Sequence, residues 1–264
     1  MDRYAVVGNP VAHSVSPRIH AIFAAAAGQE LRYERILAEE FVSAADAFFE
    51  AGGRGLNVTL PFKQDAFGWV DRVDDAAREA EAVNVVACGD DGYSGYNTDG
   101  IGLVRDLQDN LGLSLNGRRV LVLGAGGAVR GVLGPLSRTG ADELIVANRT
   151  ESRARALRQV FPNIGAASLA DVRGAYDLVI NGTSAGFAGE VPDIDPEAVR
   201  NAFCYDMSYA PGSDTPFCAW SREHGAAGVS GGLGMLVEQA AETFLLWRGV
   251  RPPTAGVVAA LDRG

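Results

Sequence analysis

One lysine stands out among the side chains that could take part in acid–base chemistry. The 264-residue chain holds 23 lysines and arginines, and Lys63 is its only lysine. Arginine supplies a positive charge as well as lysine does, but its guanidinium does not give up a proton at ordinary pH, whereas a lysine amine can. The sequence therefore suggests that an amine is needed at position 63. Chance within an arginine-biased composition stays open as the alternative.

Four polar stretches, one of which ends at Lys63, each lie after a predicted strand or in a loop. They are Ser14-Val15-Ser16, Asn57-Val58-Thr59-Leu60-Pro61-Phe62-Lys63, Ala82-Val83-Asn84 and Asn97-Thr98-Asp99. In an open α/β sheet, ligands bind at the carboxyl ends of the strands. Hydroxyls near a helix N-terminus suit a carboxylate, and amides and carboxylates suit the hydroxyls of a polar ring. Each residue also has a structural interpretation. Ser16 and Asp99 can be helix caps, and Asn84 and Asn97 can merely hold turns.

A glycine-rich turn later in the chain has the features of a nucleotide-phosphate site. The apolar run Val120-Leu121-Val122-Leu123 predicts a strand that is buried on both faces. Gly124-Ala125-Gly126-Gly127-Ala128 then predicts a tight turn, and residues 128–137 a helix whose N-terminus would face a phosphate. The fingerprint is incomplete, because Val129 takes the place of the third glycine. A flavin site, an S-adenosylmethionine site or a purely structural turn stays open from the glycines alone.

The end of the next predicted strand indicates which cofactor binds. Folds that bind NAD usually place an acidic residue there, about 20 residues after the glycines, to hold the ribose 2′-hydroxyl. Here the sequence is Asn148-Arg149-Thr150, in which Arg149 offers a planar cation and Thr150 a hydroxyl to a 2′-phosphate. The sequence therefore favours NADP(H) over NAD. Glu151 could accept a ribose hydroxyl and keeps NAD use open.

The elements that position these residues divide into two α/β domains. In the first half, strands are predicted at residues 4–8, 31–37 and 55–59, helices at 17–27, 41–51, from 62 and at 71–80, and a β-hairpin at 83–96. In the second half, further strands are predicted at 144–147, 178–181 and 203–207, and helices at 100–111, 152–160 and 235–248. We expect an N-terminal α/β substrate-binding and catalytic domain, residues 1–99, and a Rossmann-like doubly wound NADP-binding domain, residues 100–234. The helix from residue 235 is amphipathic and is expected to return to the first domain, which residues 235–264 then complete.

The composition excludes several classes of protein. The apolar content of 47% and the charged content of 21% are ordinary for a soluble globular protein. A net charge of −10 argues against nucleic acid or an anionic membrane as partner. The three cysteines, Cys88, Cys204 and Cys218, have no C-x-x-C spacing, so neither a disulfide framework nor a metal site is expected. Without a membrane-length apolar stretch or a signal-like start, a cytoplasmic location is expected.

Eight motifs of the chain closely resemble those of the shikimate dehydrogenase family. They are residues 8–17 (GNPVAHSVSP), 57–63 (NVTLPFK), 97–100 (NTDG), 124–128 (GAGGA), 148–150 (NRT), 181–184 (NGTS), 206–209 (DMSY) and 234–236 (GML). The resemblance spans almost the whole chain. It implies reversible, NADPH-dependent reduction of 3-dehydroshikimate to shikimate, in the biosynthesis of chorismate and the aromatic amino acids.

The resemblance also implies roles for individual residues. Lys63 and Asp99 match the family's catalytic pair. The positions that match substrate contacts are Ser14, Ser16, Thr59, Lys63, Asn84, Asp99, Tyr209 and Gln239. The positions that match cofactor contacts are Asp75, Gly124, Ala125, Gly126, Gly127, Ala128, Asn148, Arg149, Thr150, Met207 and Gly232. The expected partners are the small-molecule substrate and NADP(H), and family habit allows a homodimer.

Three positions depart from the family's pattern. Glu81 stands where glycine is usual, Val85 replaces a threonine, and Gly231 replaces an aspartate. None of these changes removes a catalytic group, and they bear on substrate preference and loop geometry. Two alternatives stay open: a quinate/shikimate dehydrogenase that also uses NAD, and a non-catalytic NADP-binding regulatory homologue. Retention of both Lys63 and Asp99 argues against the second.

Overall fold

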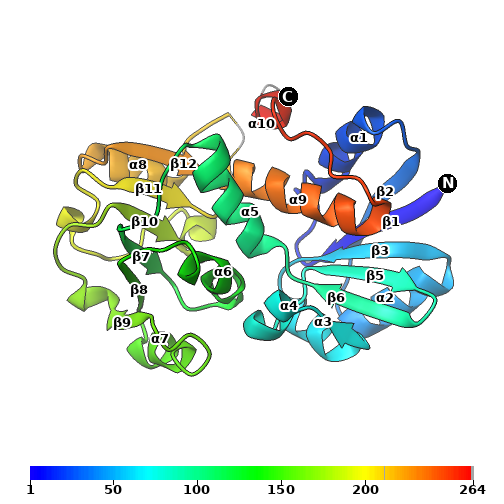
Figure 1. Ribbon diagram of the computed structural model, residues 1–264, viewed down its shortest axis with the longest axis horizontal. Coiled ribbons are helices and arrows are strands. Elements are labelled where there is room, and N and C mark those ends of the chain that lie inside the picture. Colours follow the sequence, from blue (N-terminus) through cyan, green and yellow to red (C-terminus); the bar gives the residue numbers. More distant parts are fainter. Residues whose placement is uncertain (211, 263–264) are drawn as a thin grey trace.

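Two α/β units lie side by side in this chain (Figure 1). The computed structural model describes residues 1–210 and 212–262. Each unit is built on a six-stranded sheet, and helices α5 (Asp99–Arg105) and α9 (Leu233–Arg248) lie between the two sheets. The predicted two-domain α/β class is confirmed, whereas the exact division at residues 99 and 234 stays a prediction.

The first sheet is mixed and is built from the N-terminal part of the chain. Its strands are β1 (Asp2–Gly8), β2 (Leu31–Leu37), β3 (Gly53–Val58), β4 (Arg72–Val73), β5 (Val85–Gly89) and β6 (Gly92–Tyr96), in the order β2-β1-β3-β5-β6-β4. β1 is parallel to β2 and β3, whereas β5 is antiparallel to β3 and β6. The carboxyl ends of β1, β3 and β6 and the start of β5 therefore share one edge of the sheet.

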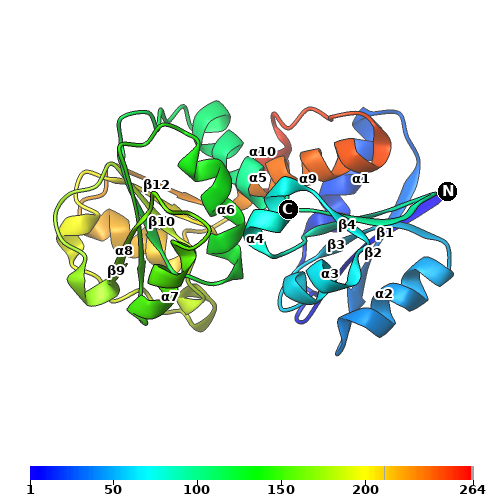
Figure 2. The ribbon, with the colours of Figure 1, turned by 60° about the horizontal axis from the view of Figure 1, so that its bottom comes forward.

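Helices cover both faces of this sheet (Figure 2). They are α2 (Phe41–Glu50), α3 (Lys63–Trp69) and α4 (Asp75–Ala80) on one side, with α1 (Ser16–Ala26) and α9 on the other. The side chains of β1 alternate accordingly. Ala5 and Val7 pack in the cluster with α2, and Tyr4 stacks on Trp247 of α9 with ring centroids 4.6 Å apart.

The second sheet is entirely parallel, in the order β12-β11-β10-β7-β8-β9. Its strands are β7 (Arg119–Leu123), β8 (Glu143–Asn148), β9 (Gly165–Ser168), β10 (Leu178–Asn181), β11 (Phe203–Asp206) and β12 (Gly228–Gly231). This is the strand order of a doubly wound dinucleotide-binding sheet, which binds its ligand where the order reverses, between β7 and β10.

The faces of the second sheet are covered by α5, α6 (Gly127–Ser137) and α7 (Glu151–Leu157) on one side and by α8 (Pro216–Glu223) on the other. Alternate residues of β7 enter the two cores: Val122 packs with Val129 of α6, and Leu121 packs with Phe217 of α8. The remaining short elements are the π-helix η1 (Asp106–Asn110) and the 3-10 helices η2 (Leu169–Asp171), η3 (Ala185–Ala188) and η4 (Pro196–Ala198).

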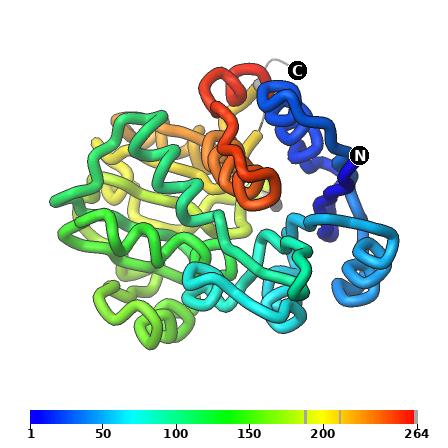
Figure 3. The backbone as a smooth tube through the Cα atoms, turned by 45° about the vertical axis from the view of Figure 1, so that its right-hand side comes forward, coloured from blue at the N-terminus to red at the C-terminus, as the bar shows by residue number. Residues whose placement is uncertain are grey.

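The C-terminal part of the chain returns to the first sheet, as predicted. Phe244 of α9 lies edge-on to Phe23 of α1, with centroids 5.9 Å apart. α10 (Val257–Asp262) adds Val257 and Leu261 to the same apolar cluster, and Figure 3 shows this segment beside α1. In the part of the chain that the structure describes, no helix is long and apolar enough to cross a membrane.

Several elements differ from the sequence prediction. The helix predicted at 100–111 is α5 followed by the π-helix η1, and the predicted 71–80 helix is the short strand β4 followed by α4. β9, β12, α8 and α10 were not predicted. β9 is Gly-Ala-Ala-Ser, which has neither the β-branched residues nor the alternation by which a strand is recognised.

His20 of α1 is fully buried in an aromatic cluster. Its ring stacks on Tyr33 with centroids 4.4 Å apart and also lies near Phe23, Phe244 and Trp247. Neither ring nitrogen has a hydrogen-bond partner among the described residues. Burial lowers the pKa of His20 to about 3, so the folded protein holds this ring neutral.

The protein is expected to lose stability as the pH falls from about 6.5 towards 3. The folded pKa of His20 lies below its unfolded value, so this contribution is fully present above the unfolded pKa and is lost as protons bind the unfolded chain. His20→Phe keeps the aromatic packing without a titratable group. Urea unfolding at about pH 7.5 and about pH 4.5 should show a drop in unfolding free energy that is about 2–3 kcal/mol smaller in the variant. Equal drops would contradict this role of His20.

Candidate active site

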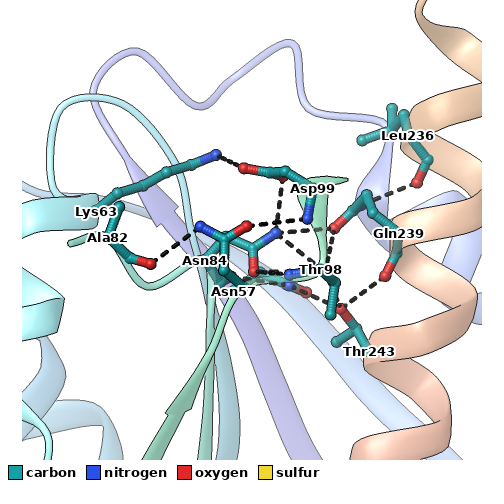
Figure 4. Close-up of polar contacts among 10 residues, drawn as sticks. Asn57, Lys63, Ala82, Asn84, Thr98, Asp99, Leu236, Gln239 and Thr243 are labelled. Carbon is teal, nitrogen blue, oxygen red and sulfur yellow. Dashed lines mark hydrogen bonds and ion pairs between the residues drawn. The ribbon is translucent and has the colours of Figure 1, made fainter. Parts of the chain in front are cut away.

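Lys63 and Asp99 form an ion pair at the edge of the first sheet where β3 and β6 end. Lys63 is the first residue of α3 and Asp99 the first residue of α5. The Nζ of Lys63 donates to Oδ2 of Asp99 at 2.5 Å, and both side chains are largely buried (Figure 4). The two residues lie 36 positions apart in sequence, and the sheet topology brings them together.

Asn84 holds the second oxygen of the Asp99 carboxylate. Its Nδ2 donates to Oδ1 of Asp99 at 2.8 Å, while its Oδ1 accepts the backbone N–H of Thr98 at 2.9 Å. The Oδ1 of Asn97 accepts the backbone N–H of Asp99 at 3.1 Å. Because both carboxylate oxygens are engaged, the orientation of Asp99 and of the Lys63 amine that it binds is restricted.

Helix α9 contributes polar groups to the same site (Figure 4). The Oε1 of Gln239 lies 3.3 Å from the hydroxyl of Thr98 and 3.5 Å from Nδ2 of Asn84. Thr243, one helical turn further on, donates to the Gln239 carbonyl at 3.0 Å and has its hydroxyl 3.4 Å from Nδ2 of Asn57. The helix that was predicted to pack on the first domain therefore also lines the site.

Tyr33 and Thr243 belong to this polar network but to none of the four polar stretches singled out from the sequence. Asn57, Asn97 and Thr98 lie in those stretches but were given no role in binding substrate or cofactor. The Tyr33 hydroxyl donates to Oδ1 of Asn57 at 2.7 Å, and Nδ2 of Asn57 is 3.2 Å from the Asn84 carbonyl. Burial raises the pKa of Tyr33, which keeps its hydroxyl a donor. Asn57 had a usable signal, because it opens one of the four polar stretches singled out from the sequence. Tyr33 had none, since an aromatic residue in a strand is ordinary.

The loop before α1 brings two predicted serines together. The Oγ of Ser14 lies 3.1 Å from the Oγ of Ser16 and accepts the Ser16 backbone N–H at 3.3 Å. Arg35 of β2 donates to the Ser14 carbonyl through Nε at 2.8 Å and Nη2 at 2.6 Å, which anchors the loop. Tyr209, from the loop after β11, packs with Val15 against the apolar cluster between α1 and α9, and burial raises its pKa. The structure thus gathers Ser14, Ser16 and Tyr209.

Thr59 lies at the carboxyl end of β3, beside the end of β1. Its backbone N–H donates to the Val7 carbonyl at 3.0 Å. Its Cγ2 is so close to Gly8 that a Cβ built on Gly8 would come within 2.3 Å. Glycine at position 8 therefore allows β1 to end against Thr59.

The capping interpretations of Ser16 and Asp99 are wrong. α1 begins at Ser16 itself, with Val15 in the N-cap position, and α5 begins at Asp99, with Thr98 in that position. Neither Val15 nor Thr98 makes a side-chain capping bond, and the N–H groups of Ser16 and Asp99 are accepted instead by the side chains of Ser14 and Asn97. The turn-holding interpretation of Asn97 is confirmed by its bond to the Asp99 N–H, whereas Asn84 binds both a turn and the carboxylate.

The glycine-rich turn forms a cradle at the start of α6. Gly124 has φ +106°, and a Cβ there would lie 3.0 Å from the Gly182 carbonyl oxygen. A Cβ on Gly126 or Gly127 would instead meet no described atom within 4 Å, so the space above them is open. α6 has no side-chain cap in the described structure, and the N–H groups of a first helical turn lack intrahelical acceptors. The cradle therefore fits a nucleotide phosphate.

Met207 and Gly232 lie together near this turn. A Cβ on Gly232 would come within 2.4 Å of the Met207 carbonyl oxygen, and Met207 Sδ lies 3.0 Å from the Cβ position of Gly182. The buried carboxylate of Asp206 accepts the Ser208 N–H at 3.0 Å and so holds this loop. Burial also raises the pKa of Asp206.

The predicted ribose-phosphate residues lie where β8 ends, with Asn148 half-buried at the last position of the strand. The Gly124 N–H donates to the Ala147 carbonyl at 2.8 Å, which places this strand end next to the turn. Nδ2 of Asn148 donates to the Thr150 carbonyl at 2.9 Å, and Arg149 and Thr150 are exposed. The carboxylate of Glu151, the residue that kept NAD use open, pairs with Arg155 at 2.6 Å.

Asp75, which was predicted to contact the cofactor, lies apart from the other predicted cofactor residues. It begins α4, its side chain is fully exposed, and Oδ1 lies 4.0 Å from Nε of Arg78. Among the described residues we find no polar contact between Asp75 and the glycine-rich turn. Its cofactor role stays a prediction.

The cofactor cradle and the ion pair are neighbours. A Cβ on Gly131 of α6 would lie 3.4 Å from Oδ2 of Asp99, and one on Gly100 would lie 2.8 Å from the Gly131 carbonyl oxygen. Glycine at both positions therefore allows α6 to approach the start of α5 closely. An amine that can give or take a proton thus lies beside the helix of a nucleotide cradle, which is the arrangement for proton transfer coupled to hydride transfer.

Comparison with known proteins gives matches along most of the chain. Family models match at residues 6–86 (shikimate dehydrogenase substrate binding domain), 106–188 (shikimate / quinate 5-dehydrogenase) and 232–261 (shikimate 5′-dehydrogenase C-terminal domain). A shikimate dehydrogenase (NADP(+)) of Alkalilimnicola ehrlichii is 53% identical over 98% of both chains.

Two crystal structures are also similar over nearly their whole length. An Ael1 enzyme from Pseudomonas putida is 42% identical, with a TM-score of 0.91 over 99% of this chain and 98% of that one. Shikimate 5-dehydrogenase from Thermus thermophilus, in complex with NADP(H) and shikimate, is 33% identical. Its TM-score is 0.86, and the match covers 100% of this chain and 99% of that one.

Fold and site define a two-domain nucleotide-binding α/β protein of the dehydrogenase class, with a lysine–aspartate pair beside the cofactor cradle. At this identity and coverage, the chain belongs to the shikimate dehydrogenase family.

Proposed function

We propose that this protein is an NADP-dependent shikimate dehydrogenase, which reduces 3-dehydroshikimate reversibly to shikimate in aromatic amino acid biosynthesis. The observation that carries the proposal is the Lys63–Asp99 pair, at 2.5 Å, placed against the helix of the glycine-rich cradle. NADPH, when bound, supplies a hydride to the substrate ketone. The protein must then hold the substrate, stabilise the developing alkoxide and supply a proton.

Lys63 is the proposed proton donor in reduction and acceptor in oxidation. Its ammonium also provides positive charge at the oxygen that becomes an alkoxide. Asp99 orients this amine through Oδ2 and is itself held by Asn84 through Oδ1. We propose that Asp99 also accepts a hydrogen bond from a substrate hydroxyl.

The remaining polar groups divide between carboxylate and ring hydroxyls of the substrate. Ser14, Ser16 and Tyr209, which lie near one another, suit the carboxylate, because hydroxyls donate to it at the N-terminus of α1. Thr59, Asn84 and Gln239 suit the ring hydroxyls. This assignment rests on the donors and acceptors that these side chains present.

For the cofactor we propose that the first-turn N–H groups of α6 bind the pyrophosphate and that Asn148, Arg149 and Thr150 bind the 2′-phosphate. Met207 and Gly232 would contact the nicotinamide side. We also propose residues 1–99 with 235–264 as the substrate-binding domain and residues 100–234 as the cofactor domain. A homodimer and a cytoplasmic location are further proposals, testable by sedimentation and by cell fractionation.

The function is tested by following the transferred hydrogen. The protein is incubated with 3-dehydroshikimate and NADPH deuterated at nicotinamide C4, and the product is analysed by NMR. We expect shikimate that carries deuterium at the carbinol carbon formed from the ketone. Absence of shikimate, despite NADPH binding, would support the regulatory-homologue alternative instead.

Arg149→Ala is expected to raise the KM for NADP by about 10–100-fold, because a charge-assisted hydrogen bond to phosphate contributes about 1.5–3 kcal/mol. The kcat and the KM for shikimate should change little. Initial rates at varied NADP and at varied shikimate measure both effects. Arg158→Ala, an exposed arginine at the end of α7, is the matched control. Equal KM values for NADP in the Arg149 variant and the wild type would exclude this contact.

A further inference from the structure

Three consecutive residues before β5 hold the catalytic pair from two sides. The Val83 N–H donates to the Lys63 carbonyl at 2.9 Å. The Ala82 carbonyl accepts Nδ2 of Asn97 at 3.0 Å, and the third residue of the segment, Asn84, donates to Asp99. Any shift of residues 82–84 would therefore move Lys63 and Asp99 relative to each other.

The residue just before this segment is tied to the cofactor helix. Oε2 of Glu81 lies 2.7 Å from Nη2 of Arg130, which belongs to the first turns of α6. Arg130 is 20% exposed and Glu81 55%, so the arginine is the more buried partner. The pair joins the helix of the nucleotide cradle to the segment that positions Lys63 and Asp99.

Glu81 occupies a backbone conformation that favours glycine. It ends α4 with φ +47° and ψ +40°, the left-handed region in which a side chain costs free energy. Glycine, usual at this position in the family that the sequence resembles, would fit without strain. The strained glutamate therefore points to a use for its carboxylate, and the bond to Arg130 is that use.

We propose that Glu81 and Arg130 are positioning residues that couple the cofactor helix to the geometry of the Lys63–Asp99 pair. This inference rests on the proposed function. When NADP(H) binds at the start of α6, the Glu81–Arg130 bond holds residues 82–84 in register with that helix. The Lys63 amine and the Asp99 carboxylate would then keep their relative position when the cofactor is bound.

A second ion pair across the same two helices supplies a matched control. Nη1 of Arg138 lies 3.1 Å from each carboxylate oxygen of Glu79. This pair also joins α4 to α6, but Glu79 is a helical residue and does not adjoin residues 82–84. Its loss should weaken the α4–α6 contact without moving the catalytic pair.

The test compares Glu81→Gln, Glu81→Gly and Glu79→Gln. We expect both Glu81 variants to lower kcat about 10-fold, with the KM values for shikimate and NADP within about 2-fold of wild type. Glu81→Gly also relieves the backbone strain at this position, which opposes the stability lost with the ion pair, and thermal unfolding of each variant checks that the fold is kept. Arg130→Gln should lower kcat similarly, the double variant with Glu81→Gln should lose no more, and Arg130→Lys should restore part of the rate.

A second readout does not depend on turnover. Hydrogen exchange of the Val83 amide, which donates to the Lys63 carbonyl, should accelerate about 10-fold in both Glu81 variants and stay unchanged in Glu79→Gln. Wild-type kcat and exchange in the Glu81 variants, or equal losses in the Glu79 control, would overturn the inference. A wild-type protein that does not oxidise shikimate would overturn the proposed function instead. The exchange rates of the Val83 amide in the Glu81 and Glu79 variants would still test whether Glu81 positions residues 82–84.

Discussion

Replacing Lys63 by arginine should lower kcat about 1,000-fold while the KM for shikimate and the affinity for NADP change only a few-fold. Arginine keeps the positive charge and can keep the ion pair with Asp99, so the site should hold its shape. It cannot release a proton at working pH, and general acid–base catalysis is worth about 100- to 10,000-fold. Initial rates in both directions, with NADP binding measured by fluorescence titration, separate the two effects.

A stability measurement is the control for Lys63→Arg. Its thermal unfolding temperature should match that of the wild type to within a few degrees, because arginine keeps the positive charge that pairs with Asp99. A folded variant that binds NADP and turns over at nearly the normal rate would show that Lys63 is not the acid–base group.

Asp99→Asn should lower kcat about 100-fold and raise the KM for shikimate. Asparagine lacks the negative charge that binds Nζ of Lys63. Its NH₂ group would also face a second hydrogen-bond donor, either Nζ of Lys63 or Nδ2 of Asn84, where the carboxylate oxygen had accepted a bond. Steady-state rates with both substrates measure the loss. Asp65→Asn, an exposed acid on α3, is the control and should behave as wild type. An unchanged kcat in Asp99→Asn would mean that Asp99 does not orient the amine.

Much of the fold follows from local sequence. The run Val120 to Leu123 is fully apolar and is followed by glycines, so β7, the turn and α6 were predicted nearly to the residue. β12 (Gly-Val-Ser-Gly) gave no comparable signal, because short edge strands are defined by pairing with a neighbour rather than by their own residues. The π-helix after α5 was also missed. It places the buried carboxylate of Asp106 against the Tyr205 hydroxyl at 2.7 Å, a contact between residues 99 positions apart.

The residues of the site likewise include some that the sequence indicates and some that only the packing reveals. Lys63 and Asp99 could be singled out by residue type and motif, and the sheet edge then brought them to 2.5 Å. Tyr33 and Thr243 could not, because their place in the network depends on how β2 and α9 pack on Asn57. Position 81 shows the limit of a motif: the departure from glycine was visible in the sequence, but its partner Arg130 was visible only in the structure.

The central claim, that this chain oxidises shikimate with NADP, is tested most directly by initial rates with shikimate and quinate, each against NADP and NAD. The pairing of Glu151 with Arg155 and the exposed Arg149 lead us to expect the highest kcat/KM for shikimate with NADP. The kcat/KM with NAD should be at least about 10-fold lower, because NAD lacks the 2′-phosphate and one charge-assisted hydrogen bond to phosphate contributes about that factor. Equal or higher kcat/KM with quinate and NAD would identify the dual-cofactor quinate/shikimate enzyme instead, and no turnover with any of the four pairs would contradict the account.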